Sequence, residues 1–225
     1  MKRIVLLSLI TIGINCDRDI ENIFTDIFKY NKWACQETVS GGGSTLHETR
    51  HIRNKIPELL KLLGIKTILD APCGDCHWIE HMDLANVHYI GADVVEDIVW
   101  QSKMRFANKP RFTEERFSFL HLNIITGSIP KVDLILCRDC LIHFEHELVI
   151  KTLKNMKRSG STYLLTTHYP LKRNRNIKTG SWHPINLTQS PFNLQEPLLI
   201  INEQCSIQNL SDKSLALWRL DDITL

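Results

Sequence analysis

The stretch Lys66-Thr-Ile-Leu-Asp70-Ala-Pro-Cys-Gly74-Asp75 decides the fold expected for this chain. Its first half is a short apolar run that ends in an acid, which is typical of a buried strand. Its second half holds Pro72 and Gly74, and glycine lets a backbone turn sharply and approach a ligand closely. A strand followed at once by such a turn predicts the start of an open α/β sheet, with a ligand site at the carboxyl end of the strand.

Strands and helices are expected to alternate after this stretch. Four further apolar runs predict strands, at residues 88–93, 117–122, 132–137 and 162–167. Helical spacing predicts helices around Trp78, through Trp100 and Phe106, and over 145–159. Two last apolar runs, 198–202 and 215–220, predict an antiparallel pair that closes the sheet edge. The expected fold is therefore α/β: a Rossmann-like, seven-stranded, mostly parallel sheet with an antiparallel C-terminal hairpin and helices on both faces.

The residues before the sheet predict a helical lid. Apolar side chains at helical spacing indicate an amphipathic helix over 19–31. A glycine-rich loop follows at 40–44, and Thr45 with Glu48 three residues later forms a capping box, which predicts that a second helix begins there. Pro57 is expected to kink or split that helix.

The first 16 residues allow two interpretations. Lys2 and Arg3 precede the apolar run 4–14, as charged residues do at the start of a secretory signal. The run is too short to span a bilayer. Residues 1–16 are therefore either a signal peptide or an N-terminal extension, and residues 17–225 are expected to form one domain.

The overall charge gives no indication of a nucleic-acid partner. The net charge is +2, from 27 basic and 25 acidic side chains, whereas nucleic-acid binding usually needs a clustered basic face. The basic run Lys172-Arg173-Asn-Arg175, with Lys178 nearby, is the local exception. We interpret it as a solvated loop, and contact with an anionic substrate is the alternative.

Polar side chains gather where the expected strands end. Asp93 follows the second strand, 19 residues after Gly74. An acid at this spacing can accept hydrogen bonds from both hydroxyls of a ribose. Dinucleotide binding would require Gly-x-Gly-x-x-Gly after the first strand, but the three positions hold Pro72, Gly74 and His77. A cofactor with a pyrophosphate is therefore disfavoured, while a nucleoside cofactor without phosphate remains compatible.

Several motifs, taken in order, resemble those of class I S-adenosylmethionine-dependent methyltransferases. They are Asp70-Ala-Pro-Cys-Gly-Asp75, Tyr89-Ile-Gly-Ala-Asp93, Asp133-Leu-Ile-Leu-Cys-Arg-Asp139 and Leu164-Leu-Thr-Thr167. A bacterial subgroup with unassigned substrates is similar in its flanking segments also: Val39-Ser-Gly-Gly-Gly-Ser-Thr45, Thr179-Gly-Ser-Trp-His-Pro184 and Asp212-Lys-Ser-Leu-Ala-Leu-Trp-Arg219. The resemblance covers the chain from about residue 20 onward.

This resemblance implies a cofactor, S-adenosylmethionine, and a set of residues that bind it. The cofactor-binding residues implied are Asp70, Ala71, Pro72, Gly74, Asp93, Asn123, Cys137 and Arg138. Two departures from the family pattern stand out: Asn123 replaces a frequent Asp, and Pro72 and Cys76 replace frequent glycines. Since this cofactor is made in the cytoplasm, a cytoplasmic location is expected, with export through residues 1–16 as the alternative.

The chemistry expected is direct methyl transfer to an oxygen or nitrogen atom of an unidentified acceptor, most simply a small molecule. Asp139 and His143 are the catalytic candidates, because an imidazole beside a carboxylate suits a general base. The loop 168–196, with Trp182, is expected to form one wall of the acceptor pocket. Two rival functions are an oxidoreductase with a nucleotide cofactor and a non-catalytic secreted or surface module.

Two Cys-x-x-Cys pairs, Cys73/Cys76 and Cys137/Cys140, have spacing that can mark a four-thiolate zinc site. The first and fourth strands should be neighbours, so Cys73 and Cys137 are expected to approach each other. A zinc ion there would fill the cofactor pocket. No structural metal is therefore expected, and a disulfide becomes plausible only in an exported protein.

Overall fold

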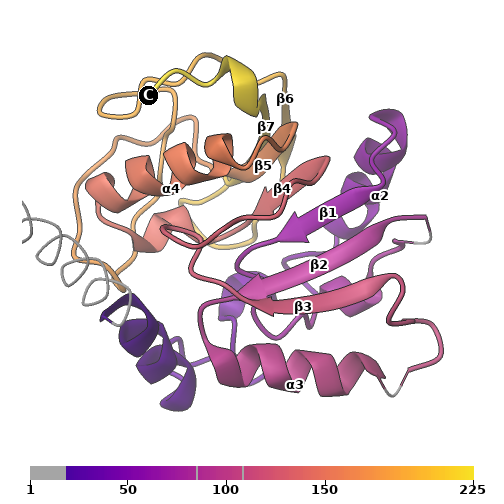
Figure 1. The fold of residues 1–225 in the computed structure, drawn as a ribbon. Helices are drawn as coiled ribbons and strands as arrows, with labels where there is room; N and C mark the ends of the chain where they lie inside the picture. Colours follow the sequence, from indigo (N-terminus) through magenta and orange to yellow (C-terminus); the bar gives the residue numbers. More distant parts are fainter. Residues whose placement is uncertain (1–18, 85, 108) are drawn as a thin grey trace, which may run out of the picture.

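The computed structural model describes residues 19–225 apart from 85 and 108, so the expectations for residues 1–16 lie outside the described part. Within that part, seven strands form one sheet (Figure 1). They are β1 (Thr67–Asp70), β2 (His88–Asp93), β3 (Phe117–His121), β4 (Leu134–Cys137), β5 (Tyr163–His168), β6 (Leu199–Asn202) and β7 (Ser214–Arg219). No helix in the described ranges has the length and apolar character needed to cross a membrane.

The sheet has the order β3-β2-β1-β4-β5-β7-β6. Strands β1 to β5 are parallel, and β7 is antiparallel to both β5 and β6. Leu69 of β1 lies opposite Ile90 of β2 and Ile135 of β4. The expected fold class, a mostly parallel seven-stranded sheet with an antiparallel C-terminal pair, is confirmed. Strand order reverses between β1 and β4, where a ligand crevice is expected at the carboxyl edge.

Alternating side chains of the strands build a separate core on each face of the sheet. Ile68 packs in the core that contains α2 (Ile52–Leu62) and α3 (Glu96–Ala107). Its neighbour Leu69 packs in the core that contains α4 (His146–Arg158). Because successive strand residues point to opposite faces, apolar residues at both positions bury β1 completely between the helices.

The segments expected to form a lid lie at the carboxyl edge of the sheet. Residues 19–29 are helical, and the following loop contains the short 3-10 helix η1 (Gly42–Ser44). Figure 1 shows the indigo helix beside the tips of the strand arrows. The ring of Phe24 contacts Phe144, which follows β4, with ring centroids 5.9 Å apart. The helix is thus fixed above the strand ends by apolar contact.

Two expected helices differ in the structure. The helix predicted from Thr45 begins at Ile52, because the Glu48 carboxylate accepts hydrogen bonds from Ser206 instead of completing the capping box. Pro57 lies inside α2 without splitting it.

The helix expected around Trp78 is only the 3-10 turn η2 (Ile79–His81). Cys76, just before it, has a φ of 54°. This left-handed conformation is incompatible with an α-helix, so no helix includes residue 76, and only a single 3-10 turn follows it.

The loop 168–196 crosses the same carboxyl edge. The backbone N–H of Gly180 donates to the carbonyl of His143 at 2.9 Å, and that of His183 donates to the carbonyl of Ile142 at 3.0 Å. Both acceptors belong to η3 (Leu141–His143), the turn after β4. The loop therefore lies beside His143, on the side of the sheet where the sequence predicted it.

Candidate active site

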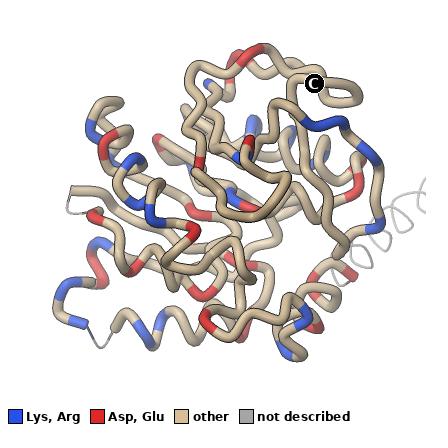
Figure 2. The backbone as a smooth tube through the Cα atoms, turned by 180° about the vertical axis from the view of Figure 1, so that it is seen from behind, with Lys and Arg blue, Asp and Glu red and all other residues tan. Residues whose placement is uncertain are grey.

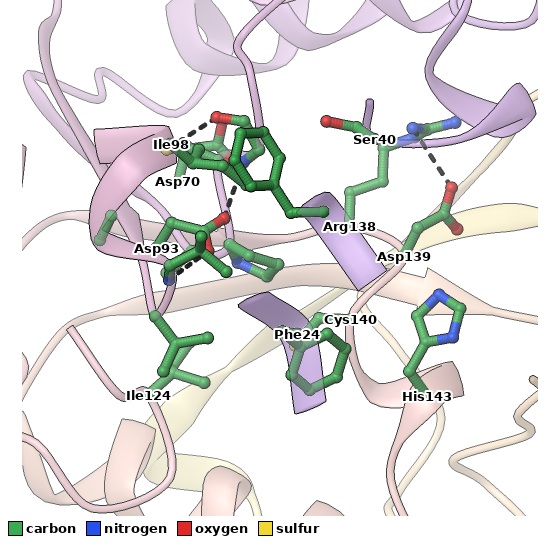
Figure 3. Close-up of a pocket in the computed structure, with 18 of the residues that line it drawn as sticks. Phe24, Ser40, Asp70, Asp93, Ile98, Ile124, Arg138, Asp139, Cys140 and His143 are labelled. Carbon is green, nitrogen blue, oxygen red and sulfur yellow. Dashed lines mark hydrogen bonds and ion pairs between the residues drawn. The ribbon is translucent and has the colours of Figure 1, made fainter. Parts of the chain in front are cut away.

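A pocket opens at the carboxyl ends of β1, β2 and β4, under helix 19–29 and the 33–44 segment (Figure 3). Its empty space is about 970 Å³, open solvent at its mouth included. Nine of the residues singled out in the sequence line it: Asp70, Ala71, Pro72, Gly74, Asp93, Asn123, Arg138, Asp139 and His143.

Asp93 ends β2 and faces the pocket. One carboxylate oxygen accepts the N–H of Val95 at 2.9 Å, and the other accepts the N–H of Gly74 at 3.1 Å. Burial raises the pKa of Asp93 to about 6, although these two hydrogen bonds favour the charged form. The carboxylate is held in one orientation while each oxygen keeps a lone pair for a ligand.

Asp70 ends β1 beside it and is 2% exposed. Its carboxylate accepts a hydrogen bond from the hydroxyl of Tyr89 at 2.7 Å. Burial raises the pKa of Asp70 to about 7, against the opposing effects of this hydrogen bond and the charge of Arg138. Two buried acids thus share one end of the pocket, and in the described residues neither has a cation in ion-pair contact.

Gly74 lies directly against the 38–40 loop of the lid. Its φ is 53°, and a Cβ at this position would lie 2.1 Å from the hydroxyl oxygen of Ser40. The Asp75 carboxylate accepts hydrogen bonds from the hydroxyls of Ser40 at 3.0 Å and Thr38 at 2.8 Å. The absence of a side chain at residue 74 and the acid at residue 75 therefore hold the 38–40 loop against the pocket.

Hydrogen bonds within the protein occupy the N–H groups of the first-strand loop. Cys73 donates to the carbonyl of Ala92 at 2.8 Å, and Gly74 donates to Asp93. Asp75 donates to the Ser40 hydroxyl at 3.1 Å, and His77 donates to Asp75. An anion bound at this turn would have to compete with each of these bonds.

Four charges, three of them buried and that of Asp139 half-buried, tie the loop after β4 to the C-terminal hairpin. The Arg138 guanidinium donates to both carboxylate oxygens of Glu203, at 2.7 and 3.2 Å, and to the carbonyl of Gly43 at 2.7 Å. Lys213 donates to Asp139 at 2.6 Å and lies 3.5 Å from Glu203. The two positive and two negative charges balance, so the cluster is neutral as a whole.

Asp139 is an anion fixed inside this cluster. Burial alone would raise its pKa, but the charges of Arg138 and Lys213 outweigh burial and hold the pKa well below the usual range. Its φ is 51°, and its N–H donates to the hydroxyl of Thr167 at 2.7 Å. A carboxylate held this way is a poor proton acceptor.

His143 lies on the same side of the pocket, across from Asp70 and Asp93 (Figure 3). Its Nδ1 is 2.8 Å from the carbonyl oxygen of Ser181, in the loop 168–196. Burial lowers the pKa of His143, and the bond to Ser181 and the charge of Asp139 only partly offset this effect. The net effect favours the neutral imidazole.

The sequence matches no protein-family model and no curated protein. Among solved structures, the N-methyltransferase NodS from Bradyrhizobium japonicum WM9 aligns over 76% of this chain and 96% of its own, with a TM-score of 0.55 at 14% identity. The chain has the class I S-adenosylmethionine-dependent methyltransferase fold.

Two further methyltransferase structures match less closely. Magnesium protoporphyrin IX methyltransferase (ChlM) from Synechocystis PCC 6803, with bound S-adenosylmethionine, aligns over 70% of this chain and 79% of its own, with a TM-score of 0.49 and 17% identity. The StiE O-MT structure aligns over 53% of this chain, with a TM-score of 0.43 and 17% identity. This chain spans only 43% of the StiE structure.

In this methyltransferase fold, one expected cofactor residue lies away from the pocket. Cys137, the last residue of β4, is fully buried in the core on the α4 face. Cys140 lines the pocket instead. The side chain of the final strand residue turns toward α4, while the turn that follows brings residue 140 back to the cavity.

In each Cys-x-x-Cys pair the two cysteines contact each other. The thiols of Cys73 and Cys76 both lie within hydrogen-bond reach of the Gly74 carbonyl oxygen, at 3.4 and 3.8 Å. Contact with Cys137 raises the pKa of Cys140. Across the described chain, no group of three or more His, Cys, Asp or Glu is placed to hold a metal ion. That the protein carries no structural zinc stays a prediction for metal analysis.

Trp182 does not line the pocket. It is 39% exposed, and its ring contacts Tyr169 edge-on at 6.4 Å. The loop 168–196 reaches the site through the carbonyl of Ser181 instead. The predicted position of this loop is observed, whereas the acceptor-facing role expected of Trp182 is not.

Trp33, Glu203 and Lys213 are residues of the pocket or the charge cluster whose roles the sequence did not predict. Trp33 stacks on His143 with ring centroids 5.0 Å apart and lines the pocket, and Glu203 and Lys213 complete the charge cluster. A tryptophan between a lid helix and a glycine-rich loop was an available signal. For Glu203 and Lys213 nothing local indicated a partner 65 to 74 residues away.

Basic and acidic residues are interspersed along the described backbone (Figure 2). In the basic run of the loop 168–196, Lys172 donates to the carbonyl of Asn209 at 2.6 Å and lies 3.8 Å from Asp212. Arg175 contacts the carbonyl of Trp182 at 3.5 Å. Part of this run therefore serves to anchor the loop to the rest of the molecule.

Proposed function

We propose that this chain is an S-adenosylmethionine-dependent methyltransferase that acts on an oxygen or nitrogen atom of its acceptor. The observation that carries the proposal is the pair Asp70 and Asp93, two buried acids with raised pKa values in one pocket. Burying carboxylates without a cation in contact is costly, and a cationic ligand would remove that cost.

S-adenosylmethionine fits the chemistry of this end of the pocket. It carries a positive sulfonium, an ammonium group and a ribose diol. Asp93 would accept the ribose hydroxyls, since each of its oxygens keeps a lone pair beside its backbone hydrogen bond. Asp70 would face the cationic methionine portion, and apolar Ile98 and Ile124 line the same region.

The occupied N–H groups of the first-strand loop support this cofactor over a dinucleotide. A pyrophosphate binds through free backbone N–H groups at such a turn. Here those of Gly74, Asp75 and His77 donate to protein acceptors. Two nearby carboxylates would also repel a phosphate. The site therefore favours a cationic nucleoside.

The protein's own contribution to methyl transfer would be alignment and exclusion of water. The cofactor supplies the methyl group and its leaving group when bound. Helix 19–29 and the clamped 38–40 loop cover the pocket, so the acceptor would meet the methyl donor away from solvent. Holding two reactants in line contributes much of the rate in such reactions.

Calorimetry on the full chain tests the proposal with S-adenosylmethionine, S-adenosylhomocysteine and NAD. We expect both sulfur compounds to bind, and NAD to bind far more weakly. An Asp93→Ala variant should lose about 1.5–3 kcal/mol of binding free energy for the sulfur compounds through two lost hydrogen bonds. Asp97→Ala, on the exposed start of α3, is the matched control and should bind as the wild type does.

Wild-type protein that binds neither sulfur compound at millimolar concentration would refute the proposal. It would favour the rival interpretation of a non-catalytic module. Equal binding of NAD would instead favour the oxidoreductase.

A further inference from the structure

The end of the pocket away from Asp70 and Asp93 has a different chemistry. Helix 19–29 contributes Phe24, Ile27 and Phe28 to the pocket lining, and the rings of Phe144 and Trp33 lie against Phe24 and His143 respectively. Trp33 lies almost flat on His143, with 26° between the ring planes. A planar apolar molecule suits such walls, because aromatic rings stack on one another at this spacing.

His143 presents a hydrogen-bond acceptor to this apolar end. A carbonyl oxygen only accepts, so the contact with Ser181 places the imidazole proton on Nδ1. The other nitrogen, Nε2, then carries a lone pair. No protein partner for Nε2 is found among residues 19–225 without 85 and 108, and the ring lines the pocket.

The charges near this end offer no site for a charged acceptor. Asp139 is engaged by Lys213 at 2.6 Å and by Arg138 at 3.3 Å. Arg138 is in turn held by Glu203 at 2.7 Å. Each positive charge of the cluster is paired with a negative one. A carboxylate or an ammonium group on the acceptor could therefore find an opposite charge only by breaking one of these ion pairs. Breaking a buried ion pair is costly.

We propose that the acceptor is an uncharged planar aromatic compound with a hydroxyl group, and that Nε2 of His143 accepts the proton of that hydroxyl. This inference rests on the proposed function and names its substrate class. Trp33 and the aromatic residues of helix 19–29 hold the ring. The Ser181 carbonyl is a positioning group, because it fixes which nitrogen of His143 is free.

Methyl transfer to this hydroxyl moves one proton, forms one bond and breaks another. The hydroxyl proton moves to Nε2 of His143, and the oxygen forms a bond to the methyl carbon. The donor's carbon–sulfur bond breaks, its electron pair stays on sulfur, and the neutral thioether is released. The products are an aryl methyl ether and an imidazolium that returns its proton to solvent.

A set of three ring-matched probes tests the acceptor class: 2-naphthol, 2-naphthoate and 2-naphthylmethylammonium. Binding is measured by calorimetry on the full chain saturated with S-adenosylhomocysteine. We expect 2-naphthol to bind about tenfold or more tightly than either charged probe. Equal or tighter binding of a charged probe, or no binding of any of the three at millimolar concentration, would overturn the proposal.

Nitrogen NMR of the protein with labelled histidine gives a second readout, independent of activity. Wild-type protein should show a neutral Nδ1-protonated histidine whose free nitrogen shifts when 2-naphthol is added. The signal should vanish in His143→Gln and persist in the control His88→Gln, which is exposed at the far end of β2. A histidine protonated on Nε2, or one that does not respond to 2-naphthol, would contradict the assignment.

The failure of this inference is distinguishable from failure of the proposed function. Binding of S-adenosylhomocysteine is measured first and decides the methyltransferase proposal alone. If it does not bind, the three probes are titrated into the ligand-free chain, and their ranking still decides the chemistry of the aromatic end.

Discussion

Asp70 should make the protein less stable as the pH rises from 5 to 8. It is fully buried, and its pKa lies at about 7 in the folded chain, against an ordinary value of 3.8. Between these values the folded protein binds a proton that the unfolded chain has released. The free energy of unfolding therefore falls with increasing pH across this window.

The size of the effect follows from the two pKa values. Linkage predicts a loss on the order of 2–3 kcal/mol from this group between pH 5 and pH 8. An Asp70→Asn variant removes the titration and keeps an oxygen that can accept the hydrogen bond of Tyr89. Relative to this variant, the wild type should become less stable by that amount as the pH rises.

Urea unfolding of both proteins at pH 5, 6, 7 and 8 measures the difference. Every other titrating group is common to the two proteins. The buried histidines have lowered pKa values, so their effect on stability has the opposite sign to that of Asp70, but it is the same in both proteins. The subtraction therefore isolates Asp70. Parallel stability curves across this range would refute the reasoning, since they would mean that the folded chain does not retain the proton on residue 70.

Two further substitutions and one metal analysis test the architecture of the site. Glu203→Gln should destabilise the protein by about 3 kcal/mol in urea unfolding, because it leaves Arg138 buried with less compensating charge. The control Glu58→Gln changes an exposed glutamate and should alter stability little. Equal losses of stability in the two variants would contradict a stabilising role for the buried pair. Gly74→Ala should destabilise the protein by about 1–3 kcal/mol, because residue 74 has a positive φ and the new Cβ would collide with Ser40. Adding Ser40→Gly to this variant should restore part of the lost stability. If stability is not restored, the collision with Ser40 is not the cause of the loss. Metal analysis of protein purified without chelator should find far less than one zinc per chain, and a stoichiometric zinc lost on mutation of the Cys-x-x-Cys pairs would overturn our assignment of the pocket.

The ends of the parallel strands could be predicted because a polar residue follows each apolar run directly in the sequence. Asp70 and Asp93 follow short apolar runs, and parallel strands place such residues at one edge of the sheet. The same rule brought Asn123 and Arg138 to the pocket. Periodicity and the order of elements were enough for this part of the site.

Contacts between distant segments were not predictable in the same way. The Arg138–Glu203 pair joins residues 65 positions apart, with no repeating pattern to link them. The Glu48 carboxylate was assigned to a local cap, but a partner 158 residues away competes for it. Local rules fail at such positions because tertiary hydrogen bonds replace the local ones.

Strand β7 lies between β5 and β6 although it follows both in the chain, and this order affects how the protein is made. When synthesis has reached only the end of β5, that strand has an unpaired edge. At this stage Arg138 and Asp139 also lack Glu203 and Lys213. An open strand edge invites pairing with other chains. The nascent chain therefore exposes this edge until β7 has been added, and the charge cluster is complete only after Lys213 has been synthesised.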